Sequence, residues 1–455
     1  RMFGPLEKLM AEEIAPFIGN THTETSVTGS TMTRAYHEAL HRIKDHVHAD
    51  AGGAIICYGA GMIAVVNKLQ RILGLRVHEK YRPQVQLAPA DRPIVFVTHM
   101  EHHSNQTSWI ESVAEVRVIN ATADGLVDLA HLDTLLAEYR DRRVKIAAVT
   151  SCSNVTGILT PYHEIAARLH RAGGLCFVDF AASAPYIDID MHPAAHPDGW
   201  LDAIYFSPHK FLGGPGTSGV LIFAKKLYTN RVPDNPGGGT VNWTNPWGEH
   251  QYFDDVEARE DGGTPGFTQA IRAALCIRLK EAMGVAAIQR REHELLDLVW
   301  DRLRAIPGLH LLADQHRDRL GILSFYIDDL HYNLAVRLLN DRFGIQSRGG
   351  CSCAGTYGHY LLHVTRAHSK SITDQINRGN QTEKPGWVRV SLHPTTTDDE
   401  ARRLVAAIAD LAAHHRAWAA DYTYQPATNE FTHRQDTGAL GARVEKWFGG
   451  FPSKP

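Results

Sequence analysis

The sequence has little of what disulfide-stabilised, membrane-spanning or nucleic-acid-binding proteins need. Its 455 residues include only six cysteines, without regular spacing, which argues against a disulfide framework and fits reduced thiols in a cytoplasmic protein. The longest apolar stretch, around residues 404–413, is far shorter than the roughly 20 residues that cross a bilayer. The formal net charge of -3 argues against a broad surface for nucleic acid or for an anionic membrane. The first residues carry charges where a secretory signal needs an apolar run.

The composition, with 44% hydrophobic and 21% charged residues, is typical of a folded globular protein. Apolar strand-like runs alternate with helical patterns from about residue 50 to 225, which predicts an α/β domain with a largely parallel sheet covered on both faces. A helix-like connector and a second α+β unit follow. We expect an N-terminal segment over 1–20 that packs with the small domain, a large domain over 21–285, a small domain over 286–424, a polar loop over 369–386 and a tail over 425–455.

Two residues at strand ends point to one cofactor. Lys210 lies in the turn of YFSPHKFLGGPGTSGVLIF, and Asp179 ends the apolar run of LCFVDFAAS. A lysine that loses solvation becomes an amine that forms Schiff bases, and a carboxylate at the end of a buried strand either caps a helix or pairs with a buried cation. Pyridoxal 5'-phosphate needs such a lysine for its aldehyde and an acid for its pyridine nitrogen. For Lys210 alone, the competing interpretation is a solvated surface lysine.

Other polar residues after strands could surround the cofactor ring. His102 in THMEHHSNQTSW could stack on a flat ring or act as an acid or base, although one of two adjacent histidines often has a capping or core role. The adjacent His103 receives no firm role. Asn154 in SCSNVTG could donate to the phenolic oxygen, and a simple turn-forming asparagine is the competing interpretation.

A phosphate site is expected where a glycine opens a helix. In YGAGMIAVVNKL, Gly61 is followed by Met62 and Ile63, so free backbone N–H groups and the positive end of the helix dipole would favour a phosphate. A G-x-G pattern is weak evidence by itself. Side-chain donors that could complete the site are Ser207, His209 and Thr264.

Together these motifs resemble those of the cysteine desulfurase and selenocysteine lyase group of class V pyridoxal-phosphate enzymes. EHH, SNxxG, VD, SxHK, the GTP turn and RxSL occur in that group's order, over nearly the whole chain. The resemblance implies the fold-type I architecture, with a seven-stranded, mainly parallel sheet in the large domain and a smaller C-terminal α+β domain. It implies that His102 stacks on the ring, Asn154 bonds its oxygen, Asp179 pairs with the pyridinium, Lys210 forms the Schiff base, and Gly61, Met62, Ile63, Ser207 and His209 hold the phosphate.

The resemblance also implies residues for the substrate and for a second subunit. Thr264 would reach the phosphate of the other subunit, which makes an obligate homodimer with shared active sites. Arg389 in WVRVSL matches the arginine that holds the substrate α-carboxylate, and Arg348 is a second substrate-binding candidate. Cys353 in RGGCSCAG matches the cysteine that accepts sulfur, and a thiol near arginine and histidine is expected to be reactive. Because Cys351 lies two residues before Cys353, a redox pair of these two cysteines remains an alternative, whereas no metal site is predicted.

The expected activity is cleavage at the β-carbon of a small L-amino acid. The first candidate is desulfuration of L-cysteine to alanine with a persulfide on Cys353, which a sulfur-acceptor protein could then collect. Three alternatives stay open: an aminotransferase or epimerase in which Cys353 is incidental, an enzyme that cleaves aspartate or cysteine sulfinate and could form carbon–carbon bonds, and a non-catalytic cofactor-binding scaffold.

Overall fold

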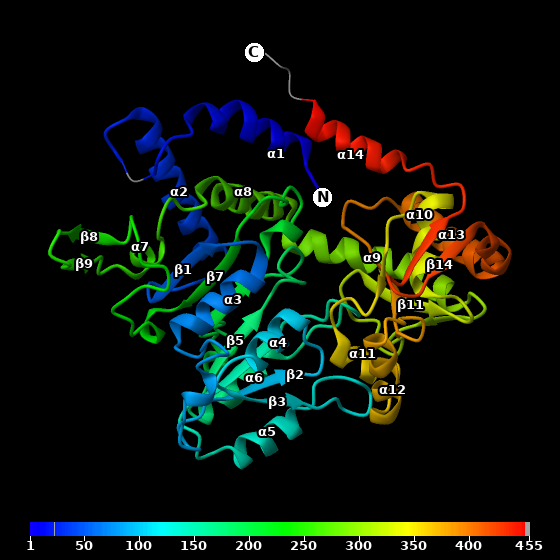
Figure 1. Ribbon diagram of the computed structural model, residues 1–455, viewed down its shortest axis with the longest axis horizontal. Coiled ribbons are helices and arrows are strands. Elements are labelled where there is room, and N and C mark those ends of the chain that lie inside the picture. The colour runs from blue at the N-terminus through cyan, green and yellow to red at the C-terminus, as the bar shows by residue number, and fades with distance from the viewer. Residues whose placement is uncertain (22, 451–455) are drawn as a thin grey trace. The chain divides into compact units, whose positions relative to one another are not determined.

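The structure is a computed structural model that describes residues 1–21 and 23–450 (Figure 1). The chain divides into two compact units. The larger comprises Arg1–His293 together with Gln315–Gly321 and Cys353–Tyr360, and the smaller comprises Glu294–Asp314, Ile322–Ser352 and the residues from Leu361 on. Each unit has its own sheet, so we describe the two separately.

A seven-stranded sheet organises the larger unit, with strand order β1-β7-β6-β5-β4-β2-β3. All neighbouring strands pair in parallel except β7, which is antiparallel to both β1 and β6. The mainly parallel seven-stranded sheet expected from the sequence is therefore confirmed. Its strands are β1 (Gly53–Tyr58), β2 (Ile94–Thr98), β3 (Glu115–Ile119), β4 (Lys145–Thr150), β5 (Leu175–Asp179), β6 (Ala203–Phe206) and β7 (Gly219–Ala224).

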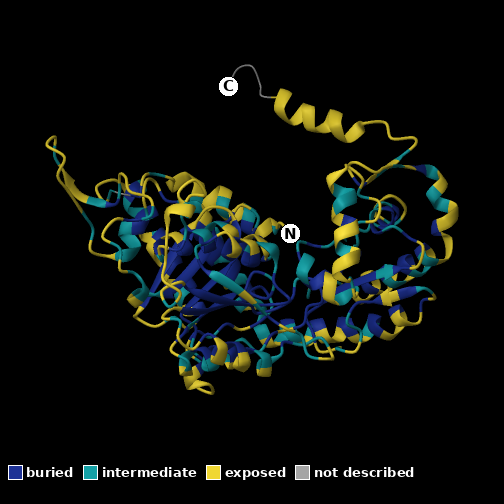
Figure 2. Ribbon diagram, turned by 60° about the horizontal axis from the view of Figure 1, so that its bottom comes forward, coloured by how far each residue is buried: buried dark blue, intermediate teal, exposed yellow. Residues whose placement is uncertain are grey.

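Both faces of this sheet are buried, which explains why its strands are nearly continuous apolar runs. Residues that alternate along the strands, such as Val95 and Val97, pack with Val65, Leu69 and Trp109 on one face. Their neighbours on the strands are also buried, and Figure 2 shows the strands dark between lighter helices. The helices of this part are α1 (Gly4–Leu9), α2 (Val27–His46), α3 (Gly61–Ile72), α4 (His103–Ile110), α5 (Leu129–Glu138), α6 (Tyr162–Arg171), α7 (Val256–Glu260), α8 (Phe267–Met283) and the first half of α9 (Val285–Arg304), whose residues from Glu294 on belong to the smaller unit.

Three features of the larger unit differ from the sequence expectation or add to it. The long helix-like connector is broken at Gly284, whose φ of 77° lies in the left-handed region. Residues 1–20 were expected to pack with the small domain, but they group with the larger unit, because Arg272 forms a bidentate ion pair with Glu7 at 2.6 and 2.8 Å. The short hairpin of β8 (Val241–Thr244) and β9 (His250–Tyr252) carries two exposed tryptophans.

The smaller unit is an α+β domain with a four-stranded antiparallel sheet in the order β10-β11-β13-β12. Its core joins buried leucines of α9, α10 and α13 to the apolar residues of β11 and β13. Its elements are β10 (Leu309–Leu311), β11 (Ile322–Ile327), α10 (Tyr332–Phe343), β12 (Arg348–Gly350), α11 (Gly355–Leu361, mostly in the larger unit), α12 (Arg366–Asn377), β13 (Trp387–Ser391), α13 (Asp398–Trp418), β14 (Tyr422–Gln425), β15 (Glu430–His433) and α14 (Ala439–Gly449).

Two polar segments of the smaller unit are more regular than the sequence predicts. The expected loop over 369–386 begins inside helix α12, whose N-cap Thr365 accepts a hydrogen bond from the His368 N–H. The expected tail over 425–455 contains strand β15 and helix α14. Only Ile372 of α12 is buried, so the apolar stripe that identifies a helix from its sequence is nearly absent there.

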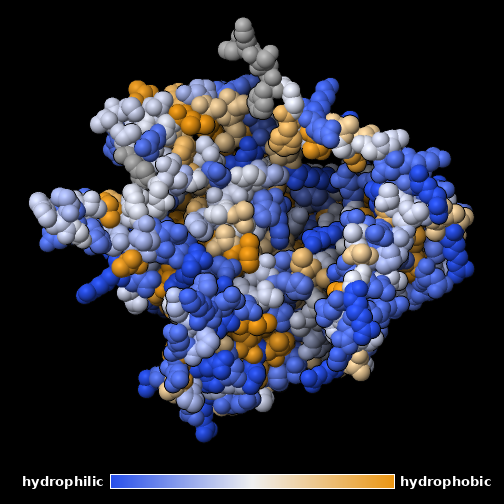
Figure 3. All heavy atoms as spheres, viewed as in Figure 1, coloured by the Kyte–Doolittle hydropathy of each residue, from blue (hydrophilic) through white to orange (hydrophobic). Residues whose placement is uncertain are grey.

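Apolar side chains also occur on the surface, but they do not form one continuous apolar area. On the face in Figure 3, hydrophobic residues form separate patches among hydrophilic ones. The largest exposed fractions include Trp247 at 83% and Phe448 at 81%. Within the described residues, no helix is long and apolar enough to cross a membrane.

Candidate active site

The carboxyl ends of β2, β4, β5 and β6 lie along one edge of the large sheet, because these strands are parallel neighbours. Strand β1 runs in the same direction as β6, since both are antiparallel to β7. The segments that follow these strands carry His102, Asn154, Asp179, Lys210 and Gly61. The fold therefore gathers at one edge residues that are up to 149 positions apart in the chain, as open α/β sheets do at their ligand sites.

The start of α3 forms a cradle for an anion. Its N-cap Ala60 provides no side-chain acceptor, and the Met62 N–H donates to Ser207 Oγ at 2.9 Å. At Gly61, where φ is 70°, a Cβ would come within 2.8 Å of a ring carbon of His209 and 3.2 Å of Ser207 Oγ. Glycine is thus required both by the backbone conformation and by the close approach. Backbone N–H groups, a hydroxyl and an imidazole converge here, while the adjacent Ile63 is 43% exposed.

Asp179 and Lys210 provide the charged part of the site. Asp179 ends β5 and is 3% exposed, and its Oδ1 accepts a hydrogen bond from the Ala181 N–H at 2.8 Å. Burial raises the pKa of Asp179 to about 6, although the positive charge of Lys210 and the Ala181 N–H oppose the rise. Lys210 is exposed at the end of the short turn Pro208–Lys210. Burial, followed by the charge of Lys210, lowers the pKa of His209.

His102 and Asn154 occupy short structured turns at the same edge. His102 is the N-cap of α4, and its Nδ1 accepts a hydrogen bond from the Ser104 N–H at 3.1 Å. The ring proton of a neutral His102 must therefore lie on Nε2. Asn154 is half-buried in a turn in which Ser153 Oγ accepts from the N–H groups of residues 155 and 156, both at 3.1 Å. Both side chains are thus carried by backbone that local hydrogen bonds hold in place.

A buried polar network behind Asp179 was not found from the sequence. Glu101 is fully buried and accepts hydrogen bonds from the Thr98 hydroxyl at 2.7 Å, the Thr150 N–H at 2.8 Å and Asn105 Nδ2 at 2.8 Å. The Asn105 oxygen accepts in turn from the Tyr205 hydroxyl at 2.7 Å. Burial raises the pKa of Glu101 to about 7, and the nearby charge of Asp179 acts in the same direction. The signal available in the sequence was an acidic residue three positions after the end of the mostly apolar strand β2.

The candidate nucleophile, Cys353, is the first residue of the segment Cys353–Tyr360 of the larger unit, directly after Ser352 of the smaller unit. Cys353 is half-buried, and both Ser352 and Cys353 have positive φ values, 51° and 59°. The Cys353 carbonyl accepts a hydrogen bond from the His103 N–H at 2.7 Å. This contact connects the Cys353 turn to the first residue of α4, directly after His102.

The two candidate substrate-binding arginines are neighbours in the smaller unit. Arg348 on β12 is directly opposite Arg389 on β13 in the antiparallel register. Side chains opposite each other in a sheet project from the same face, so two guanidinium groups share one surface. Arg389 is half-buried, while Arg348 is exposed. Such a pair suits an anionic group with two oxygens.

Within the part of the chain that the structure describes, Thr264 forms no hydrogen bond with the residues of the phosphate cradle. It lies exposed on a turn in which the Gly263 N–H donates to the Gly238 carbonyl at 2.7 Å. The Thr264 side chain is therefore accessible on the surface of the larger unit.

These residues fit pyridoxal 5'-phosphate. The α3 cradle offers donors of the kind that a phosphate needs, and a side chain at Gly61 would occupy it. The hydrogen bond to Asp179 uses Oδ1 and leaves Oδ2 for a ligand, so this buried carboxylate can pair with a protonated ring nitrogen. No group of three or more potential metal ligands occurs among the described residues.

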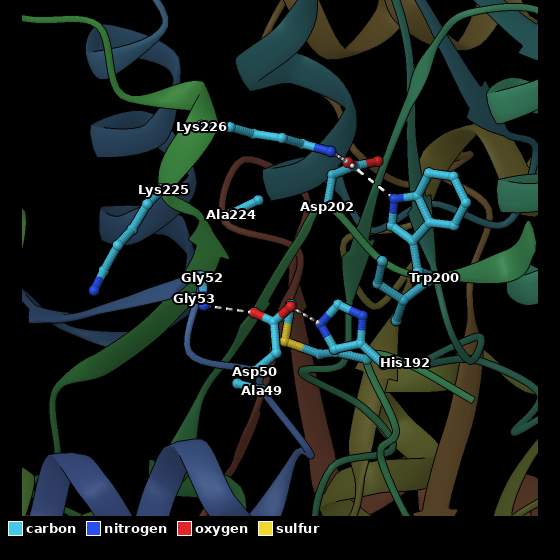
Figure 4. Close-up of a pocket in the computed structure, with 12 residues that line it drawn as sticks. Ala49, Asp50, Gly52, Gly53, His192, Trp200, Asp202, Ala224, Lys225 and Lys226 are labelled. Atoms are coloured by element: carbon cyan, nitrogen blue, oxygen red, sulfur yellow. Dashed lines mark hydrogen bonds and ion pairs between the residues drawn. The ribbon is translucent and has the colours of Figure 1, made fainter. Parts of the chain in front are cut away.

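A cavity of about 340 Å³ lies at the opposite edge of the sheet, beside the starts of β1 and β6 (Figure 4). Most of its charged side chains pair with one another: Lys226 lies 3.3 Å from Asp202, and His192 lies 3.6 Å from Asp50. This cavity contains none of the residues predicted to be functional.

Comparisons with known proteins identify the family and the fold of this chain. The family model described as aminotransferase class V matches residues 7–404. A probable cysteine desulfurase of Halalkalibacterium halodurans is 29% identical over 341 residues, which are 74% of this chain and 77% of the relative. Probable cysteine desulfurase 2 of Mycobacterium leprae is 30% identical over 294 residues, 63% of this chain and 67% of the relative. The apo structure of the cysteine desulfurase from Thermococcus onnurineus NA1 has a TM-score of 0.72 at 21% identity, covering 90% of this chain and 92% of its own.

Proposed function

Because this chain belongs to the class V aminotransferase family of pyridoxal-phosphate enzymes, we propose that it is a cysteine desulfurase with Cys353 as the sulfur-accepting thiol. The observation that carries the proposal is the position of Cys353, whose backbone is hydrogen-bonded to α4 directly beside His102. An aminotransferase needs the lysine and the buried aspartate but has no use for a thiol at this place.

Four residues of the chain have separate roles in the proposed reaction. When bound, the cofactor supplies an aldehyde for the substrate amine and a ring that draws electrons from Cα. Asp179 would hold a negative charge opposite the ring nitrogen, His102 would stack on the ring, and Asn154 would donate a hydrogen bond to the ring oxygen. The Lys210 amine removes and returns the proton at Cα.

Sulfur transfer then needs only a thiol. The Cys353 Sγ attacks the sulfur of the substrate, so that a sulfur–sulfur bond forms and the carbon–sulfur bond breaks, with its electron pair on Cβ. A proton at Cβ completes alanine, and the overall change is L-cysteine plus Cys353 thiol to L-alanine plus Cys353 persulfide. We assign Arg389, with Arg348 on the adjacent strand, to the substrate carboxylate.

We further propose a homodimer with shared sites, in which Thr264 binds the phosphate of the partner subunit. The exposure of Thr264 and the 47% and 83% exposed Trp243 and Trp247 of the β8–β9 hairpin support an interface on the larger unit. A sulfur-acceptor protein would collect the persulfide.

The test is product analysis with L-cysteine, L-cysteine sulfinate and L-aspartate. The wild type should give equimolar alanine and protein-bound persulfide from L-cysteine. Cys353→Ser should lose this activity but still release sulfite from cysteine sulfinate, whose leaving group departs without a thiol. Cys351→Ser, two residues away, is the matched control and should keep the wild-type products.

Other products would refute the proposal. Keto acid without alanine would identify a transaminase, and alanine from aspartate alone would identify a decarboxylating enzyme. Unchanged turnover of L-cysteine by Cys353→Ser would show that the thiol is incidental.

A further inference from the structure

His103, which has no role in the proposed chemistry, makes two hydrogen bonds around Cys353. Its N–H donates to the Cys353 carbonyl at 2.7 Å, and its ring Nε2 accepts from the Gly355 N–H at 2.8 Å. The two bonds therefore hold the residue that carries the thiol and the second residue after it. His103 lies 250 positions before Cys353, so only the fold brings them together.

The second hydrogen bond defines the state of the imidazole. Because a backbone N–H can only donate, Nε2 must carry a lone pair, and the ring proton must lie on Nδ1. Burial lowers the pKa of His103, which favours the same neutral ring. His103 is thus placed as a hydrogen-bond acceptor rather than as a proton donor.

The backbone that carries the thiol needs such support. Ser352 and Cys353 are consecutive non-glycine residues in the left-handed region, a conformation that persists only when surrounding contacts hold it. A second contact comes one turn along α4, where the Thr356 hydroxyl donates to Gln106 Oε1 at 2.8 Å. The two contacts fix the start of α11 against α4.

The approach is close enough to restrict the sequence. A Cβ at Gly355 would lie 3.0 Å from His103 Nε2, so a side chain there would press against the imidazole. This position is therefore suited to glycine although its φ is not in the left-handed region.

We propose that His103 is a positioning residue that holds the Cys353 backbone in the conformation from which its thiol attacks. The inference deepens the proposed desulfurase function and rests on it. His102, which would stack on the ring, is the N-cap of α4, and His103 is the first residue of that helix, so one rigid element sets the nucleophile relative to the cofactor.

Two substitutions of His103 distinguish the loss of its hydrogen-bond acceptor from a change in the size of its side chain. His103→Leu removes the acceptor, whereas in His103→Gln the amide oxygen can take the place of Nε2. With L-cysteine, His103→Leu should lower kcat about tenfold at unchanged KM, as expected for a nucleophile that is present but misplaced. His103→Gln should stay within about threefold of the wild type. His78→Leu, at an exposed histidine of the same unit, is the matched control and should leave both constants unchanged.

L-cysteine sulfinate provides the readout that a merely structural role would not produce. Its sulfur leaves as sulfur dioxide, which is hydrated to sulfite, and the bonding electron pair stays on carbon, so no thiol is needed. His103→Leu should therefore release sulfite at the wild-type rate and bind pyridoxal phosphate with wild-type affinity. Gly355→Ala, which presses on the same contact from the other side, should show the same selective loss.

Equal losses with both substrates, or weaker cofactor binding by His103→Leu, would overturn the proposal, because His103 would then support the cofactor site. Wild-type kcat with L-cysteine in His103→Leu would overturn it as well. Failure of the desulfurase function itself is distinguished by Cys353→Ser, which would then retain L-cysteine turnover.

Discussion

Two pairs of buried acidic residues in the larger unit are neutralised in different ways. The first pair, Glu260 and Asp234, meets cations of the fold: Lys68 Nζ lies 2.7 Å from Glu260 and 3.4 Å from Asp234. Arg71 adds a bidentate contact to Asp234 at 2.7 and 2.8 Å. This cluster joins α3 to the segment that leads to Thr264 and is complete without a ligand.

The second pair, Asp179 and Glu101, is surrounded mainly by hydrogen-bond donors, and the charge of Lys210 only partly offsets the burial of Asp179. Burial raises the pKa values of the two carboxyl groups to about 6 and about 7, and in Asp179 it outweighs the opposing charge of Lys210. A carboxylate buried without a cation is unstable in its ionised form, and a ligand with a positive ring nitrogen would restore the balance. The difference teaches that an incomplete counter-charge, rather than burial, distinguishes the candidate site from the scaffold.

Removing the charge of Asp179 should therefore affect catalysis, whereas removing the charge of Glu260 should affect stability. Asp179→Asn keeps an oxygen for the Ala181 N–H but removes the charge that faces the cofactor, and we expect alanine formation to fall on the order of 10³-fold. Steady-state assays at saturating pyridoxal phosphate measure this. Activity within tenfold of the wild type would mean that Asp179 is not the ring's counter-charge.

Glu260→Gln should instead act on stability. Its oxygen can still accept from the Tyr228 hydroxyl and the Asp234 N–H, but an NH₂ group would face the fully buried Lys68 ammonium. Breaking one side of a buried ion pair costs about 3–5 kcal/mol, so the free energy of unfolding in urea should fall by that amount. The folded variant should keep wild-type turnover. A loss below about 1 kcal/mol would place this cluster with exposed pairs, which contribute little.

The same contrast explains how far the sequence alone could lead. Most of the seven strands were predictable because they are apolar runs that end in polar residues, and Asp179 stands out for that reason, while strand β3 alternates apolar and charged residues. The motifs around His102 and Lys210 were recognised in the same way. Their assigned roles stay predictions until the variants are measured.

What escaped prediction depends on contacts between distant residues. Glu101 receives a hydrogen bond from residue 150, and His103 meets Gly355, and no local pattern encodes either contact. Helix α12 was interpreted as a loop because a polar helix with one buried residue has no apolar periodicity. Local sequence thus identified the elements, while tertiary contacts decided which polar residues share a network.

The smallest predicted effect is a pH dependence of stability in the cofactor-free protein. Burial raises the pKa of Asp179 from an ordinary 3.8 to about 6, so between these values the folded state holds a proton that the unfolded chain has released. Stability from this group is therefore present below pH 4 and is lost as the pH rises through about 6.

Asp179→Asn should not show this loss, because its amide does not ionise. The difference in unfolding free energy between variant and wild type should shift by about 3 kcal/mol in favour of the variant between pH 4 and pH 8. Urea denaturation of both proteins without cofactor measures the shift, and adding pyridoxal phosphate should reverse it, since the ring nitrogen then balances the charge. A difference that stays constant with pH would show that Asp179 already has a counter-charge within the fold, and the contrast with Glu260 would disappear.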